Sequence, residues 1–229
     1  LGLRLQVSSY DSAETCLNVL TDFAARKSAA VIMVPPIGED WTIPSPVLSS
    51  MPVISLLHSP EIRGLHSVHP DEVRTGLDAT VGLIKRGHRN ILLLDYDSQS
   101  PANIQRRTGY EAALAKRGLT PLIMHKSQMH RLLDTIEQHG ITAIFCHNDW
   151  LALETIRQLN AAGLRVPEDV SVLGVDDSPT FTSLCDQVTT MHYPAEDIAE
   201  HVTAILQGKP LKRRVKTCTW VERKSVGSI

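Results

Sequence analysis

Residues 144–177, IFCHNDWLALETIRQLNAAGLRVPEDVSVLGVDD, hold two short apolar segments with a helical segment between them. A polar pair follows each apolar segment, Asn148-Asp149 after the first and Asp176-Asp177 after the second. Two strands joined through a helix form a right-handed crossover, which makes the strands parallel. Ligands collect beyond the carboxyl ends of parallel strands, so both pairs are predicted to face one small-molecule crevice.

The same alternation of strand and helix patterns runs through almost the whole chain. Strand patterns occupy residues 3–7, 30–34, 52–57, 91–95, 121–124, 143–146, 170–175, 188–191 and 215–221. Helix patterns occupy residues 13–24, 73–84, 103–117, 129–139, 149–162 and 198–206. This order predicts an α/β fold with parallel sheets and helices on both faces. Pro-rich and His-rich loops near residues 35–70 suggest a division into two lobes.

Composition limits the classes of partner. Of the 229 residues, 42% are hydrophobic and 21% charged, enough for one large core or two smaller ones. A net charge of -2 lacks the basic excess of a nucleic-acid surface, so these residues should not bind DNA by themselves. The four cysteines have no CxxC spacing, and neither a transmembrane stretch nor a signal peptide is visible. We therefore expect a cytoplasmic chain without a membrane partner. The sequence leaves open whether a segment before Leu1 was removed.

Both polar pairs have two interpretations. Asn148 or Asp149 can cap the helix that follows, because either side chain can accept a bond from a first-turn N–H. Asp176 and Asp177 can form a turn, since the sequence Asp-Asp-Ser-Pro favours turn initiation. Their position past buried strands also makes all four candidates for ligand contacts.

Two arginines and two aromatic residues complete the candidate site. Arg106 and Arg107 lie early in their helix, where a cation opposes the helix dipole, so at least one should have a partner outside that helix. The planar guanidinium group suits carboxylates, phosphates and vicinal hydroxyls. Phe145 and Trp150 flank the Asn-Asp pair, either as core residues or as walls of a pocket.

Signatures of metal sites and catalysis are not visible. His88, between a helix end and a strand, is predicted to be a structural imidazole. The other histidines lack the HxxxH or HExxH spacing of a metal site, and we expect no metal and no cofactor. There is no GxSxG elbow, GxGxxG fingerprint or P-loop. These observations disfavour an enzyme.

Several motifs in order resemble the effector-binding domain of the lactose-repressor (LacI/GalR) family of bacterial transcription regulators. The motifs are residues 87–91 (GHRNI), 106–110 (RRTGY), the run 148–177 with GLRVPED at 163–169, Thr189-Thr190, and 221–225 (VERKS). The long run is specific in combination, whereas Gly-His or Thr-Thr alone would be a weak signal. Nearly the whole chain follows the family's order.

The resemblance implies a two-lobed periplasmic-binding-protein-like fold with an effector in the cleft. It implies a first lobe from residues 1–68 and 193–215, and a second from residues 69–192 and 216–229. Matched motif by motif, Arg106, Asn148 and Asp176 look like effector contacts, and Phe145 like a wall of the pocket. Asp149 and Asp177 are then expected to be local capping or turn residues.

The resemblance further implies an effector-sensing and dimerisation domain that binds a small polar metabolite such as a sugar. Operator DNA would be bound only through a helix-turn-helix headpiece that precedes such a domain, and a homodimer is expected. Family members also begin the domain with a strand and helix before the segment matching residues 3–23. The alternatives are a periplasmic solute-binding protein of a transporter, which shares the fold, and an α/β enzyme using Asp176 and Asp177 as acid and base.

Overall fold

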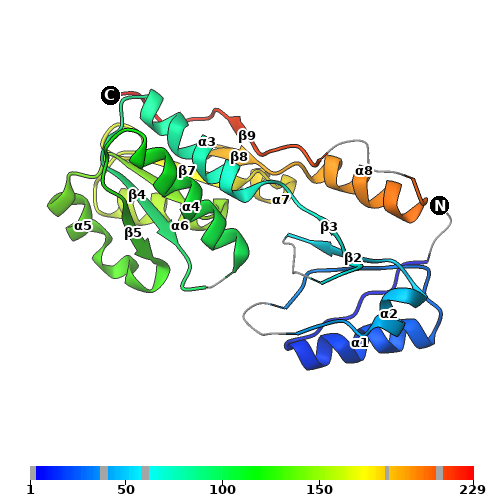
Figure 1. Cartoon of the computed structure of the whole chain (residues 1–229). Helices are drawn as coiled ribbons and strands as arrows, with labels where there is room; N and C mark the ends of the chain where they lie inside the picture. The colour runs from blue at the N-terminus through cyan, green and yellow to red at the C-terminus, as the bar shows by residue number, and fades with distance from the viewer. Residues whose placement is uncertain (1–3, 37–40, 58–61, 99, 184–185, 210–213) are drawn as a thin grey trace. The chain divides into compact units, whose positions relative to one another are not determined.

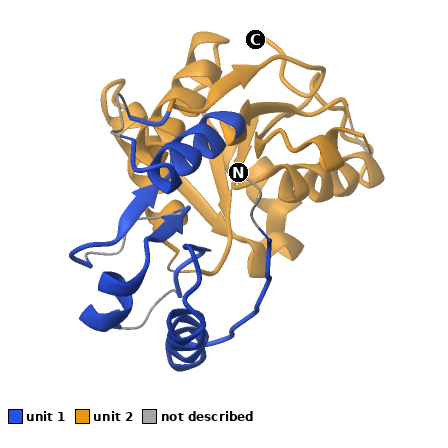
Figure 2. Cartoon of the chain, turned by 90° about the vertical axis from the view of Figure 1, so that its right-hand side faces the viewer, with its two compact units in different colours: residues 1–69, 196–215 blue, residues 70–195, 216–229 orange. Residues whose placement is uncertain are grey.

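The computed structural model describes residues 4–36, 41–57, 62–98, 100–183, 186–209 and 214–229. The chain forms two compact units (Figure 2). Unit 1 consists of residues 1–69 and 196–215, and unit 2 of residues 70–195 and 216–229.

Unit 1 is built on a parallel three-stranded sheet with the order β1-β2-β3 (Figure 1). The strands are β1 (Val31–Met33), β2 (Val53–Leu56) and β3 (His66–Val68), and the helices are α1 (Ala13–Ala25), α2 (Ser45–Ser50) and most of α8 (Ala195–Leu206). One core cluster joins β1 and β2 to α1 and α2, and a second joins Ile54 and Val68 to Val202 of α8. Successive residues of a strand face opposite sides, so the sheet carries a core on each face.

Unit 2 is built on a six-stranded sheet with the order β5-β4-β6-β7-β8-β9. All pairings are parallel except that of β8 with β9, which is antiparallel. The strands are β4 (Ile91–Asp95), β5 (Leu122–His125), β6 (Ala143–Cys146), β7 (Ser171–Asp176), β8 (Thr189–His192) and β9 (Thr219–Val221). The helices are α3 (Glu72–Lys85), α4 (Pro101–Ala115), α5 (Leu132–His139), α6 (Asp149–Ala161), the short α7 (Pro179–Thr182) and the 3-10 helix η1 (Lys126–Arg131).

The central strands of unit 2 are buried on both faces. Leu92 and Ile144 belong to the cluster that includes α5 and α6, whereas Leu93 and Phe145 belong to the one that includes α3 and α4. This arrangement explains why the strand sequences are continuous apolar runs rather than alternating ones. The predicted fold class, an α/β architecture with parallel sheets and helices on both faces, is confirmed.

Some element predictions were wrong. Residues 4–7 form no strand, and residue 3 lies outside the described residues; among those residues β1 pairs only with β2, so no partner supports the alternating pattern. The strand predicted over 215–221 is limited to β9, three residues that pair with β8. β3 and α2 lie within segments that the sequence indicated as loops.

Candidate functional site

The parallel strands β4, β6 and β7 of unit 2 end at one edge of the sheet, and polar residues follow them there. Asp95 ends β4, Asn148 lies two residues after the end of β6 as the N-cap of α6, and Asp176 ends β7. Arg106 of α4 donates Nη1 to the carbonyl of His147 (2.6 Å) and lies within electrostatic range of Asp176. The structure therefore places Arg106 next to the polar residues at the ends of β6 and β7, the two segments that the sequence indicated.

Arg106 is held by a buried ion pair with Glu72, the first residue of α3. Nε donates to Oε2 (2.7 Å) and Nη2 to Oε1 (3.0 Å), the two parallel bonds that a guanidinium fork makes with a carboxylate. Burial by itself would lower the pKa of Arg106, but the charge and hydrogen bonds of Glu72 raise it above its ordinary value. The guanidinium is therefore permanently charged and fixed in orientation.

Two glycines allow this pair to form. A Cβ added to Gly76 of α3 would lie 2.1 Å from the Arg106 carbonyl oxygen, and one added to Gly109 of α4 would lie 2.0 Å from the Val73 carbonyl oxygen. Real Cβ atoms do not approach so closely, so only glycine permits this crossing of the two helices. The close crossing brings Glu72 against Arg106.

Asp176 has a backbone conformation that side chains rarely adopt. Its φ is 126° and that of Asp177 is 56°, and strained backbone of this kind clusters at functional sites. Burial is the largest influence on Asp176 and raises its pKa to about 7; Arg106 acts in the opposite direction, while Asp149 and Glu72 add to the rise. A perturbed carboxyl beside a buried guanidinium is typical of a binding site.

Of the two polar residues after β6, the structure gives the cap of the following helix to Asn148. Asn148 is the N-cap of α6, because its Oδ1 accepts from the Leu151 N–H (3.0 Å) and also from the Tyr96 hydroxyl (3.3 Å). Its side-chain NH2 group carries hydrogen-bond donors that the cap does not use. Asp149 was expected to be a local capping or turn residue, and the capping role is therefore wrong.

Asp149 instead ties the start of α6 to the neighbouring strands. Its carboxylate accepts from the Asp177 N–H (2.8 Å) and from the Thr190 hydroxyl (2.6 Å), and Asp149 is only 1% exposed. A Cβ on Gly174 would lie 2.1 Å from Asp149 Oδ1, so the carboxylate fits only against glycine. Burial raises the Asp149 pKa to about 6.

Asp177 is a local contact residue. Burial acts to raise its pKa, but hydrogen bonds from Arg223 and His192 lower it below its ordinary value. His192 Nδ1 lies 2.9 Å from Asp177 Oδ2, and Arg223 forms an ion pair with the other oxygen. Asp177 thus ties the end of β7 to β8 and to the segment after β9.

The remaining predicted residues are structural or peripheral. Phe145 of β6 has no exposed surface and packs in the core against α3 and α4. The candidate site therefore rests on the other three predicted residues, Arg106, Asn148 and Asp176. Arg107 binds buried Asp95 (3.1 Å), which means that both arginines have partners outside their helix, as predicted. His88 is a structural imidazole, also as predicted: its ring nitrogens lie 3.0 Å from Thr142 Oγ1 and 3.2 Å from the Gly227 carbonyl oxygen.

Two residues of this edge were not predicted from the sequence. Glu72 was missed because an acid in the first turn of a helix is ordinarily explained by the helix dipole. Tyr193 follows β8, its hydroxyl oxygen is buried, and Glu72, Arg106 and Asp176 all influence its pKa. Its only signal in the sequence was an aromatic residue directly after a strand end. Over the described ranges, no group of three or more His, Cys, Asp or Glu could hold a metal ion.

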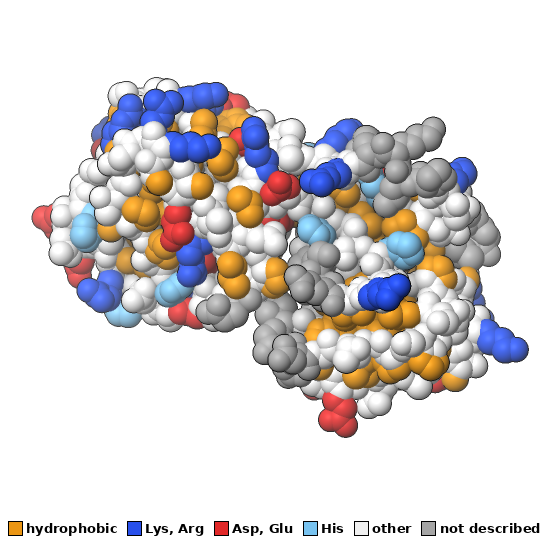
Figure 3. Space-filling model, viewed as in Figure 1, with side chains coloured by type: hydrophobic (Ala, Val, Ile, Leu, Met, Phe, Trp, Pro, Cys, Tyr) orange, Lys and Arg blue, Asp and Glu red, His pale blue; other side chains and the backbone are white. Residues whose placement is uncertain are grey.

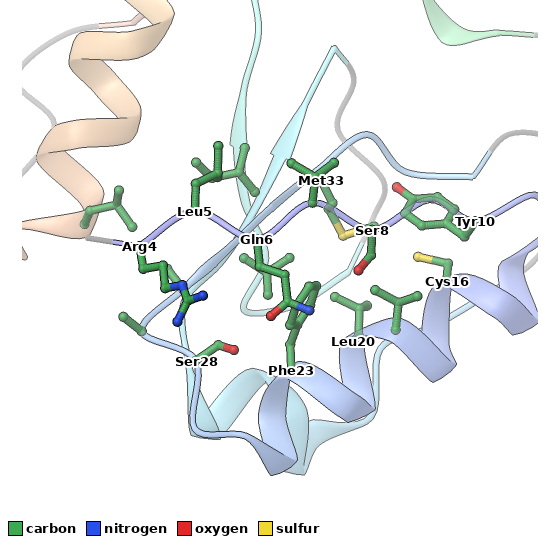
Figure 4. Close-up of a pocket in the computed structure, with 17 residues that line it drawn as sticks. Arg4, Leu5, Gln6, Ser8, Tyr10, Cys16, Leu20, Phe23, Ser28 and Met33 are labelled. Atoms are coloured by element: carbon green, nitrogen blue, oxygen red, sulfur yellow. The ribbon is translucent and has the colours of Figure 1, made fainter. Parts of the chain in front are cut away.

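Unit 1 contains a separate cavity of about 700 Å³. It is bounded by residues 4–8, by α1 and by β1; Leu5, Val7 and Ile32 are exposed there, and Figure 3 shows hydrophobic side chains on the surface of this unit. In Figure 4, Leu20 and Phe23 project from α1 toward the segment that carries Gln6 and Ser8. The cavity holds none of the predicted site residues. The additional strand expected before residue 3 stays a prediction.

Comparison with known proteins decides the family. A family model described as "Periplasmic binding protein-like domain" matches residues 82–226, more than half of the chain. The chain belongs to this family.

Its relatives place this periplasmic-binding-protein-like chain among the effector-binding domains of LacI-type regulators. The HTH-type transcriptional repressor CytR of Escherichia coli (strain K12) is 31% identical over 160 residues, which cover 65% of this chain and 46% of CytR. This chain thus spans about half the length of that relative.

Two solved structures share the fold. A sugar-binding LacI-family regulator from Escherichia coli, complexed with phosphate, superposes with a TM-score of 0.77 at 22% identity, covering 96% of this chain and 84% of that one. A periplasmic binding protein/LacI regulator from Alkaliphilus metalliredigens QYMF, complexed with D-xylulofuranose, gives 0.74 at 19% identity, covering 94% and 84%.

Proposed function

We propose that this domain senses a small, uncharged, hydroxyl-rich metabolite such as a sugar, and that its occupancy controls a LacI-type regulator. The observation that carries the proposal is the buried Arg106–Glu72 pair beside Asp176 at the carboxyl edge of the unit 2 sheet. Arg106 and the Asn148 NH2 group supply donors, and Asp176 supplies acceptors. Convergent donors and acceptors of this kind match the alternating donor and acceptor character of vicinal hydroxyls.

The charges at this edge favour a neutral ligand over an anion. Glu72 already neutralises Arg106, Asp176 adds a carboxyl group beside the pair, and Asp149 lies within electrostatic range of Asp176. An incoming phosphate or carboxylate would meet like charge in a partly buried setting, where repulsion is strong. Of two structures with the same fold, one contains phosphate and the other a sugar. A binding experiment must therefore compare an anion with uncharged compounds.

Isothermal titration calorimetry on the full-length regulator tests the proposal. The panel comprises D-ribose, D-xylulose, cytidine, adenosine and inorganic phosphate, chosen to vary hydroxyls, bases and charge. We expect at least one uncharged compound to bind and phosphate not to bind. Asp176→Ala should abolish the binding, while Asp186→Ala, at an exposed site, should leave it unchanged. Binding by no uncharged member, or binding that survives Asp176→Ala, would contradict the proposal.

The mechanism we propose is differential binding rather than catalysis. An effector shifts a conformational equilibrium only as far as its affinities for the two states differ. Recovery of the bound compound unchanged after long incubation is expected, and turnover would support an enzyme instead.

DNA binding and dimerisation are proposals for the whole regulator. We propose that operator DNA is bound by a headpiece outside these 229 residues, because a net charge of -2 lacks the basic excess of a nucleic-acid surface. We also propose a cytoplasmic homodimer. Sedimentation of the full-length protein, with and without operator DNA, would test both, and a monomeric regulator would contradict the second. Across the part of the chain that the structure describes, no helix is both long and apolar enough to cross a membrane.

A further inference from the structure

The hydroxyl of Tyr193 is a buried polar group that makes no hydrogen bond with the residues the structure describes. Tyr193 follows β8 directly, and its N–H donates to the carbonyl of Asp176 (3.0 Å), which fixes the residue beside the end of β7. Its ring packs against the core cluster that contains Tyr110. The Oη atom is shielded from solvent and makes no hydrogen bond with any described residue.

The surroundings of this hydroxyl are those of the proposed effector site. Burial raises the Tyr193 pKa above its ordinary value, and the charges of Glu72 and Asp176 add to the rise while Arg106 opposes it. Tyr193 therefore lies within electrostatic range of the groups that hold and face Arg106. Buried polar groups are normally hydrogen-bonded, and each exception in a folded protein needs an explanation.

Tyr110 shows what a structural tyrosine looks like in the same unit. Its hydroxyl lies 2.8 Å from the Ile91 carbonyl oxygen and 2.9 Å from that of Leu122, and it accepts from the Leu122 N–H (2.8 Å). That hydroxyl links β4 to β5. Tyr193 has no comparable contact, so holding the fold together does not explain its hydroxyl.

We propose that Tyr193 Oη binds a hydroxyl group of the effector and is a specificity-determining contact beside Arg106 and Asp176. The inference rests on the proposed function and deepens it. A phenolic hydroxyl both donates and accepts, which matches an alcohol. A ligand that lacks the matching hydroxyl leaves Tyr193 unpaired in a buried site, and sites built in this way discriminate strongly against such analogues.

The first test requires no ligand and compares two identical substitutions in the full-length protein. Tyr193→Phe removes an unpartnered hydroxyl, so the ligand-free thermal unfolding midpoint should stay the same or rise. Tyr110→Phe removes a fully bonded hydroxyl and should lower the midpoint by about 2 °C or more. A Tyr193→Phe midpoint that falls as far as that of Tyr110→Phe would overturn the inference, because the hydroxyl would then have a structural partner.

The second test measures affinity by calorimetry with D-ribose, or with the panel member that binds wild-type protein. Tyr193→Phe should weaken binding about 10- to 100-fold, the range expected for a lost hydrogen bond that leaves a group unpaired. Tyr110→Phe should leave the affinity within about twofold. Among 2-deoxy-, 3-deoxy- and 5-deoxy-D-ribose, one compound should bind wild-type protein weakly and bind Tyr193→Phe no worse than D-ribose does.

The outcomes separate this inference from the proposed function. If no uncharged compound binds wild-type protein, the proposed function fails and the inference with it. If a compound binds wild-type protein and Tyr193→Phe equally while Asp176→Ala abolishes binding, the proposed function stands and the role of Tyr193 is overturned.

Discussion

Arg106 and Glu72 form a two-bond ion pair, with N–O distances of 2.7 and 3.0 Å, across 34 positions of sequence, and both side chains are almost fully buried. Removing one partner of a buried pair leaves an uncompensated charge inside the protein. We therefore expect Arg106→Ala to lower the free energy of unfolding by about 3 to 5 kcal/mol in urea denaturation. The control is Arg74→Ala, which breaks an exposed pair with Asp78 and should change the free energy of unfolding far less, because solvent screens exposed ion pairs. Equal effects would show that the Arg106 pair is not stabilising.

Gly76→Ala tests the close crossing of α3 and α4. The added methyl group would lie 2.1 Å from the Arg106 carbonyl oxygen, so the helices must move apart. We expect a loss of about 1 to 3 kcal/mol of unfolding free energy, together with weaker effector binding because Arg106 shifts. Gly227→Ala is the comparison, since its added Cβ meets nothing closer than a Pro167 side-chain carbon at 3.4 Å. A stable Gly76→Ala protein with unchanged affinity would contradict this account.

Asp176→Asn should make the ligand-free protein more stable at neutral pH. The folded-state pKa of Asp176 is raised to about 7, so the folded protein favours the protonated form. The associated stability is fully present below the unfolded-state pKa and is lost as the pH rises through about 7. The advantage of the variant over wild type should therefore grow between about pH 4 and 7 and then level off, reaching on the order of 1 to 3 kcal/mol after allowance for partial exposure.

Urea denaturation of both proteins at several pH values measures that difference. Comparison with wild type also removes the contributions of buried His88 and partly buried His147, whose lowered pKa values act in the opposite direction. A constant difference from pH 4 to 8 would refute the raised pKa.

Asn148→Asp separates the two roles of Asn148. Aspartate can still cap α6 through a side-chain oxygen, so we expect the free energy of unfolding to stay within about 0.5 kcal/mol. The substitution removes the NH2 donor and adds a negative charge, and effector affinity should fall about 10- to 100-fold in calorimetry. Asn160→Asp, at an exposed position on the same helix, controls for the charge alone. Unchanged affinity in Asn148→Asp would remove Asn148 from the site.

The central sheet could be predicted because its strands are short apolar runs separated by helices. β4, β6 and β7 are buried on both faces, so each strand appears in the sequence as a continuous apolar run. The pattern over residues 3–7 failed because a strand needs a partner, and pairing is not encoded locally. β3 was missed because it has three residues, of which only Val68 is buried.

The site was partly predictable for similar reasons. Asn148 and Asp176 stand where parallel strands end, and strand ends are visible in the sequence. Glu72 was not predictable, because its contact with Arg106 depends on how closely two helices cross. Tyr193 was missed because the lack of a partner for its hydroxyl is a property of the folded environment.

Gly174 has a consequence for redesign of the effector specificity. Its missing side chain leaves the space that the Asp149 carboxylate fills, so Gly174 cannot be exchanged while Asp149 stays. A library that varies Asn148, Asp176 and Tyr193 while keeping Gly174 and Asp149 would change the groups that we propose face the ligand and preserve the contacts that hold them. We expect most folded, altered-specificity variants to come from such a library rather than from one that randomises the whole segment 148–177.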